Sequence, residues 1–266
     1  GFSVTTEAYV DFLEANNLAD FIQDELANLG PGDILSLEKT SGRIRQAILE
    51  GAFPEDIKKD IVVAYEDMEA QYGANCDVAV RSSATAEDLP NASFAGQQES
   101  FLNIRGASNL LEACKRVFAS LYTSRAISYR DDKGFAHDEV QISVGVQKMV
   151  RSDGASSGVM FTLDTESGFR DIVLINGTWG LGENVVQGTV NPDEFRVFKP
   201  ALKEGLRPIL SRRLGDKAVK MVYTRNNAAG SSTRNVPVSK QARATFCLQD
   251  HEILELSRFA LTIENH

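Results

Sequence analysis

The hydrophobic positions of the chain change their spacing near residue 131. Before it, apolar residues recur every three or four positions, which is the pattern of amphipathic helices. After it, short alternating or β-branched runs predominate, and the stretch 140–146 alternates strictly between apolar residues and others. The predicted helices cover residues 4–29, 35–49, 54–72 and 108–130. The pattern therefore predicts an α+β chain with a helix-rich N-terminal part and a β-rich C-terminal part.

The second half of the chain predicts antiparallel strands joined by turns. Residues 156–162 lead through a polar turn into a strand at 171–175, and further strands follow over 195–224. A polar loop over 226–234 precedes a last helix that begins at Asp250. We therefore divide the chain into a helical lobe, residues 1–134, and a β-rich lobe, residues 135–266.

Composition narrows the class of protein. The 266 residues are 42% apolar, enough for a sizeable core, and carry a net charge of −9 with a pI near 5.0. Such a charge argues against a non-specific nucleic-acid binder, which shows a basic field. It does not argue against nucleotide binding, since local arginines bind phosphate within acidic proteins.

The cysteines and histidines give no metal-site signal. The three cysteines lie far apart without the spacing of metal ligands, and the three histidines do not cluster. Buried, reduced thiols and a cytoplasmic location are the resulting expectation. No apolar run approaches the roughly 18–20 residues of a membrane span, and no signal peptide is visible.

One stretch has the chemistry of a polyphosphate site. Residues 78–80 predict a short strand, which breaks into Arg81 and the small residues 82–86. Small side chains leave backbone N–H groups accessible, hydroxyls add donors, and an arginine supplies a cationic fork suited to phosphate oxygens. The structural alternative is a surface loop whose arginine pairs with Glu87 or Asp88.

Longer motifs indicate a family. Residues 78–104 read VAVRSSATAEDLPNASFAGQQESFLNI, and further motifs follow in order: ASLY at 119–122, SRAISYR at 124–130, VQKMV at 146–150, SGVMFTLDTESG at 157–168, WGLGENVVQG at 179–188 and NPDEF at 191–195. In this order they resemble the ATP-binding domain of the phosphoenolpyruvate synthase and pyruvate phosphate dikinase family. The resemblance implies an ATP-grasp-like nucleotide-binding domain whose two lobes close on ATP.

The resemblance also implies a set of nucleotide contacts. Arg81 would neutralise charge on the transferred phosphoryl group, which is the main task of a protein in this chemistry. The alternative for the arginines is a solvated helix face or an ion pair, and for Gln147 a strand-edge side chain that faces water. The expected nucleotide-binding residues are Arg81, Ser82, Ser83, Ser100, Arg125 and Gln147.

Two carboxylates are candidate magnesium ligands. Glu183 follows the glycine-rich segment WGLG, and Asp193 lies in the NPDEF motif. Hard cations on a triphosphate prefer oxygen ligands, so either residue can hold Mg²⁺ or position a water molecule. Structural turn residues are the equal alternative for both.

The resemblance implies phosphoryl transfer in several domains. The ATP β-phosphoryl group would pass to a histidine on a separate domain and then to pyruvate on another, with release of AMP and phosphate. The family's upstream glycine-rich segment with its lysine, and its downstream strands with further ligands, have no match in this sequence. We therefore expect that this polypeptide alone does not complete a turnover, and that any homodimer forms through other domains.

Two alternatives remain at the level of sequence. One is the ATP-binding domain of a related phosphotransferase that acts on rifampicin or on a glucan, because the acceptor is chosen elsewhere. The other is a module without catalytic activity, which either binds nucleotide or only keeps the fold.

Overall fold

The computed structural model describes residues 1–266 except 31–32, 85–87, 90–91, 94–99, 138–139 and 225–232. The helices are α1 (Thr6–Ala15), α2 (Leu18–Ala27), α3 (Ile34–Glu50), α4 (Glu55–Tyr72), α5 (Ala107–Ser120), α6 (Ser124–Lys133), α7 (Glu183–Val186), α8 (Lys199–Lys203), α9 (Lys240–Arg243) and α10 (Asp250–Asn265). The strands are β1 (Phe2–Val4), β2 (Val78–Ala84), β3 (Asp88–Leu89), β4 (Ala92–Ser93), β5 (Ser100–Ile104), β6 (Ile142–Lys148), β7 (Ser156–Phe161), β8 (Ile172–Trp179), β9 (Asp193–Phe198), β10 (Ile209–Arg213), β11 (Val219–Tyr223) and β12 (Thr233–Pro237).

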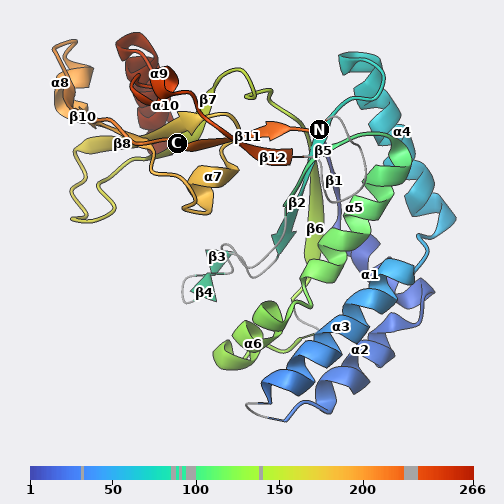
Figure 1. The fold of residues 1–266 in the computed structure, drawn as a ribbon. Helices are drawn as coiled ribbons and strands as arrows, with labels where there is room; N and C mark the ends of the chain where they lie inside the picture. The colour runs from blue at the N-terminus through green and yellow to red at the C-terminus, as the bar shows by residue number, and fades with distance from the viewer. Residues whose placement is uncertain (31–32, 85–87, 90–91, 94–99, 138–139, 225–232) are drawn as a thin grey trace. The chain divides into compact units, whose positions relative to one another are not determined.

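The first compact unit, Gly1–Met149, is a helix-covered antiparallel sheet in the order β1-β6-β2-β5. Helix α5 packs on β2, β5 and β6, and α1 packs on β6, so helices cover one face of this sheet (Figure 1). That face carries the alternating valines of β2 and β6, namely Val78, Val80, Val144 and Val146, all fully buried. Burying these side chains against helices is the main stabilisation of the unit.

The helices of this unit share an aromatic core. The rings of Phe12, Phe53 and Phe118 lie 5.1 to 5.9 Å apart, centre to centre. Beside them, the hydroxyl groups of Tyr9 and Tyr122 form a buried hydrogen bond of 2.9 Å. Side chains from α1, from α5 and from the residues that follow α3 and α5 thus pack together on the covered side of the sheet.

Two predicted helices are each interrupted. The segment 4–29 divides into α1 and α2, because Asn17 adopts the left-handed conformation with φ 53°. At the same point the Asn16 side chain forms hydrogen bonds with the backbone of Ala52. The segment 108–130 divides into α5 and α6, where Thr123 accepts a bond from the Ala126 N–H and starts a new helix. The apolar period continues across both breaks, so the sequence showed one helix in each case.

Strand β2 is longer than the sequence predicted. We expected a loop after residue 80, but the pairing with β6 continues through Ser82, Ser83 and Ala84. Strand β6 in turn belongs to the sheet of the first unit, so the chain divides after Met149, whereas the sequence placed the boundary after residue 134. The change in hydrophobic period marks the start of β6, not the end of a compact unit.

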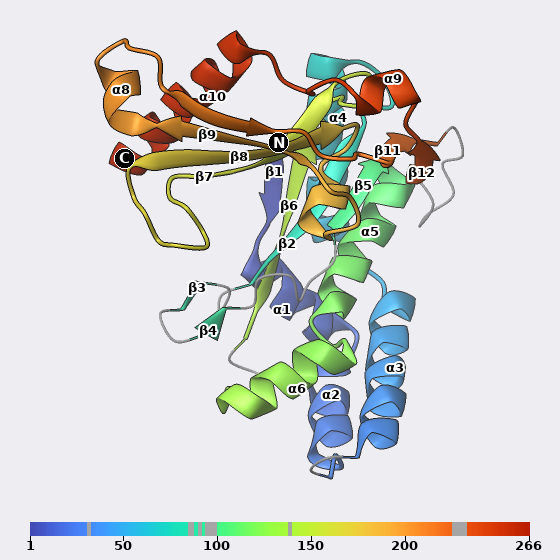
Figure 2. The same ribbon diagram turned by 60° about the vertical axis from the view of Figure 1, so that its left-hand side comes forward.

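The second unit comprises residues 150–224 and 233–266. Its antiparallel sheet has the order β10-β9-β8-β7, and α10 packs on β8, β9 and α8. The buried core between them includes Val173, Ile175, Phe195 and Ile253. Strands β11 and β12 form a separate antiparallel pair (Figure 2).

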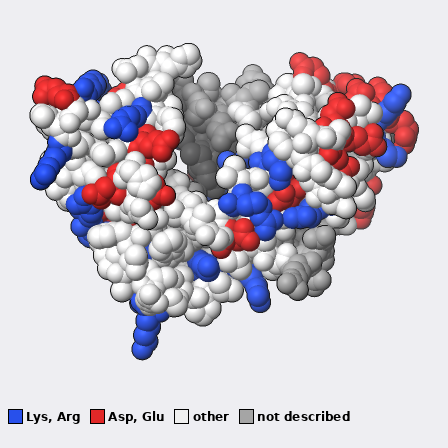
Figure 3. All heavy atoms as spheres, turned by 90° about the horizontal axis from the view of Figure 1, so that it is seen from above, with Lys and Arg blue, Asp and Glu red and all other residues white. Residues whose placement is uncertain are grey.

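No helix in the described ranges is long and apolar enough to cross a membrane. The face of the molecule seen from above carries basic and acidic side chains together (Figure 3).

The three cysteines are unpaired thiols and buried, as the sequence predicted. Burial raises the pKa of the Cys114 thiol to about 12, so this group is inert near neutral pH.

Candidate functional site

The face of the first unit's sheet opposite α5 brings three predicted site residues together. Arg81 on β2 pairs directly with Ser100 on β5, and Gln147 on β6 pairs with Ala79, two positions before Arg81. Directly paired residues and residues two apart on one strand share a face. Arg81, Ser100 and Gln147 therefore lie on the same side of the sheet, opposite the face that packs on α5. We call this side the open face; it also carries Ser83, Ser143 and Gly145.

The polar side chains of the open face are accessible. Arg81, Ser83, Ser100 and Gln147 are all exposed. No described residue makes a side-chain hydrogen bond or an ion pair with the Arg81 guanidinium. Its expected alternative partners, the side chains of Glu87 and Asp88, lie outside the described residues. An exposed arginine without a carboxylate partner keeps its five N–H donors available for an anion.

The two serines after Arg81 lie on opposite faces. Ser83 is exposed on the open face, where the Ser143 hydroxyl donates to the Ser83 carbonyl at 3.1 Å. Ser82 pairs with Val144 and its side chain is half-buried on the helix-covered face. This difference follows from the strand that continues through both residues, since consecutive side chains of a strand alternate.

Arg125 lies on α6 and not on one of the strands that form the open face. Its side chain is exposed, and α6 packs on α3. Five residues later, Arg130 is fully buried and its guanidinium donates to the Leu121 carbonyl at 2.7 Å and to His137 Nδ1 at 2.9 Å. Burial lowers the pKa of Arg130. The arginines that look alike in the sequence of this helix thus have different surroundings.

Asp193, in the second unit, is fully buried and fully bonded. Its carboxylate accepts the backbone N–H groups of Gly215 and Cys247, both at 2.8 Å, and pairs with the ammonium group of Lys217. Lys217 is also fully buried and donates to the Gly215 carbonyl at 3.0 Å. The pair joins β9 to the segments around residues 215 and 247.

The Asp193 carboxylate also affects Cys247. Burial, with the neighbouring Asp193 charge, raises the pKa of the Cys247 thiol. This thiol therefore stays protonated and inert inside the second unit.

Glu183 begins the short helix α7 and is half-buried. Its carboxylate accepts a hydrogen bond of 2.8 Å from the Gln187 side chain, one turn further on. The described part of the chain contains no group of three or more potential metal ligands. Glu183 is therefore not part of such a group among the described residues.

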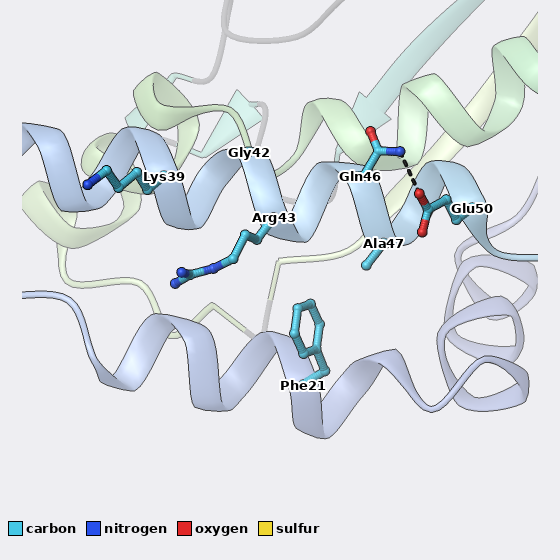
Figure 4. A pocket seen from close by; sticks show the side chains of 7 residues that line it. All are labelled: Phe21, Lys39, Gly42, Arg43, Gln46, Ala47 and Glu50. Carbon is cyan, nitrogen blue, oxygen red and sulfur yellow. Dashed lines mark hydrogen bonds between the residues drawn. The ribbon is translucent and has the colours of Figure 1, made fainter.

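A surface hollow between α2 and α3 contains none of the predicted nucleotide-binding residues (Figure 4). It has a volume of about 630 Å³. Three of its polar side chains already have partners, since Arg43 pairs with Glu25 and Gln46 donates to Glu50 at 2.7 Å. We therefore place the candidate site on the open face and not here.

Sequence reasoning missed Ser143 and Gly145 as members of the open face. The signal was present in the alternation of residues 140–146, which assigns the apolar positions to the core and the intervening positions to the other face. The pairing of β6 with β2, which brings these positions beside Arg81, was not visible in the sequence.

Comparison with known proteins identifies the family. The family model for the pyruvate phosphate dikinase AMP/ATP-binding domain matches residues 1–266. The chain belongs to this family. It is 55% identical over 267 residues to a phosphoenolpyruvate synthase of Neisseria meningitidis, 52% identical over 272 residues to one of Synechocystis, and 46% identical over 266 residues to one of Escherichia coli. All of this chain is covered in each comparison, but only 34%, 33% and 34% of the relatives, so it spans about a third of their length.

Proposed function

We propose that this chain is the ATP-binding part of a phosphoenolpyruvate synthase and that the open face of its first unit binds the nucleotide. The observation that carries the proposal is the exposed Arg81 guanidinium, without a partner among the described residues, beside Ser100 and Gln147. Membership of an AMP/ATP-binding family and similarity to phosphoenolpyruvate synthases support it.

The open face offers a distinct role for each side chain. Arg81 binds phosphate oxygens with its planar fork and neutralises charge during transfer. The hydroxyls of Ser83 and Ser100 donate to neighbouring phosphate oxygens, and Gln147 offers both donors and an acceptor to the adenine edge or the ribose. Ser82 lies on the helix-covered face and Arg125 lies on α6, outside the sheet, so we assign the contacts on the open face to the other four residues.

The ATP-grasp-like assignment and the magnesium ion are part of the same proposal. Mg²⁺ is usually held by one or two carboxylates together with the substrate phosphates. Asp193 is not available for this role, because Lys217 and two backbone amides already occupy its carboxylate. Glu183 remains the candidate ligand in the second unit.

The reaction needs parts of the protein beyond this chain. In the proposed sequence the ATP β-phosphoryl group passes to a histidine on a separate domain and then to pyruvate, with release of AMP and phosphate. The remaining two thirds of the relatives' length is where such domains would lie. A related phosphotransferase for rifampicin or a glucan would use the same nucleotide site with a different acceptor.

Calorimetric titration with ATP and Mg²⁺ tests the site. We expect Arg81→Ala to weaken ATP binding by roughly 10- to 100-fold, because a charge-assisted hydrogen bond contributes about 1.5–3 kcal/mol. Arg43→Ala is the matched control, since that exposed arginine already pairs with Glu25. Unchanged ATP affinity in Arg81→Ala would refute the proposed site.

Activity of the intact protein tests the acceptor. We expect AMP formation from ATP to depend on pyruvate. AMP formation that requires rifampicin or a glucan instead would replace the synthase assignment and leave the nucleotide site in place.

A further inference from the structure

The glycines within the strands differ in whether the surrounding packing leaves room for a side chain. A Cβ atom on Gly158 of β7 would lie 1.9 Å from the Asn176 carbonyl oxygen, and one on Gly177 of β8 would lie 2.8 Å from the Cys247 sulfur. Both contacts are far shorter than van der Waals contact. At these two positions the packing of the second unit excludes any side chain.

Gly145 of β6 has no such requirement. A Cβ atom there would meet the Arg81 carbonyl oxygen at 3.8 Å, which is ordinary contact, and no other described atom within 4 Å. Its backbone is not in the left-handed region that favours glycine. Glycine weakens a strand interior, and it often marks a place where a ligand approaches the backbone closely.

The position of Gly145 shows what would approach. It lies on the central strand β6, paired with Arg81 on β2 and with Ser3 on β1, so its missing side chain would rise from the open face directly beside Arg81. Ser143 and Gln147, two residues away on either side, share that face. The bare backbone at Gly145 thus lies between the proposed adenine contact at Gln147 and the hydroxyl of Ser143.

We propose that Gly145 is the floor of the nucleotide site, where the phosphate chain lies directly against the sheet backbone beside Arg81. This inference rests on the proposed function of the open face. A side chain at position 145 would occupy the volume that the phosphates need, while the strand itself would tolerate it. Gly145 is therefore a specificity-determining residue that acts by the space it leaves.

The experiment compares Gly145→Ala and Gly145→Val with the unchanged protein by calorimetric titration with ATP and Mg²⁺ and by thermal unfolding. We expect ATP affinity to fall with the size of the side chain, by about tenfold or more for valine, as overpacking does at a filled site. We expect the melting temperature to stay the same or rise, because β-branched residues favour strands.

Gly42→Ala is the matched control. Gly42 lies in the interior of α3, and a Cβ atom there would meet no described atom of a neighbouring element within 4 Å. Alanine there adds the same methyl group away from the open face, and we expect unchanged ATP affinity with a higher melting temperature.

The outcomes separate this inference from the proposed function. If Arg81→Ala loses ATP affinity and Gly145→Val does not, the open face binds ATP and the floor assignment is overturned. A lower melting temperature for Gly145→Ala would also overturn it, because the fold would then require the glycine. If Arg81→Ala binds ATP normally, the proposed site fails and this inference fails with it.

Discussion

Arg81 in the first unit and Asp193 in the second are both charged, and the sequence marked both as candidate site residues. The structure gives them opposite surroundings. Arg81 is exposed and meets no counter-charge among the described residues, whereas Asp193 is fully buried with Lys217 and two backbone amides around its carboxylate. A buried charge that is fully paired within the protein stabilises the fold. An exposed charge without a partner can bind a ligand.

The energetic consequences of the two arrangements are also opposite. Bringing Asp193 and Lys217 out of water costs several kcal/mol per ion, which the pair and its extra hydrogen bonds offset. If one partner is removed, the desolvation cost of the remaining buried ion is no longer offset, and the folded state is destabilised. Arg81 stays hydrated, so its removal affects the folded state little, and its effect appears when an anion binds.

The largest expected effect is the loss of Asp193. Asp193→Ala leaves the buried Lys217 ammonium without a counter-charge and the amides of Gly215 and Cys247 without an acceptor. We expect the free energy of unfolding in urea to fall by about 3–5 kcal/mol, as for other broken buried pairs.

An exposed pair in the same unit provides the control. Asp216 pairs with Arg243 at 3.3 Å on the surface, and Asp216→Ala should cost no more than about 1 kcal/mol. Similar losses for the two variants would show that burial of the Asp193 pair does not matter. The double variant Asp193→Leu with Lys217→Met should recover part of the loss, because it removes both charges.

The next effect is on binding and not on stability. Arg81→Lys keeps the positive charge but replaces the planar fork with a single ammonium group. We expect ATP affinity to fall by about tenfold, less than for Arg81→Ala, while the free energy of unfolding changes by less than about 0.5 kcal/mol. Equal affinity for the lysine variant would mean that the site needs only a point charge.

The sequence predicted the α+β class, the family and most elements, because period and motif are local properties of the chain. The strand partners of β6 are not local. Their pairing extended β2 through Ala84, placed Ser82 on the covered face and put the division between the units after Met149. Residue type therefore predicted most of the candidate site from the sequence. The strand register of the structure added Ser143 and Gly145 to it.

The same limit explains Asp193. In the sequence it is a carboxylate in a turn-rich motif, which fits a metal ligand and a structural residue equally well. Its partners Lys217 and Cys247 are 24 and 54 residues away. Only the fold brings these three residues together, so their contact could not be predicted from the sequence.

The smallest expected effect concerns Asp164, a partnered carboxylate of the second unit. The Glu166 backbone N–H donates to it at 3.0 Å, and Arg196 lies 3.4 Å from its other oxygen. The Glu166 N–H above all, with smaller help from Ser167 and Arg196, lowers the pKa of Asp164 below its ordinary value of 3.8. Its contribution to stability is therefore fully present above pH 3.8 and is lost as the pH falls through the lowered pKa of the folded state.

Asp164→Asn tests this, because asparagine keeps the shape and one acceptor oxygen but does not titrate. We expect the variant to be less stable than the parent protein at pH 7, and the difference to shrink as the pH falls below 3.8. Urea unfolding at a series of pH values measures the difference. A difference that stays constant over this range would show that the Asp164 charge, although it has partners, does not stabilise the fold, and that partner count alone is an incomplete guide to which charges hold the protein together.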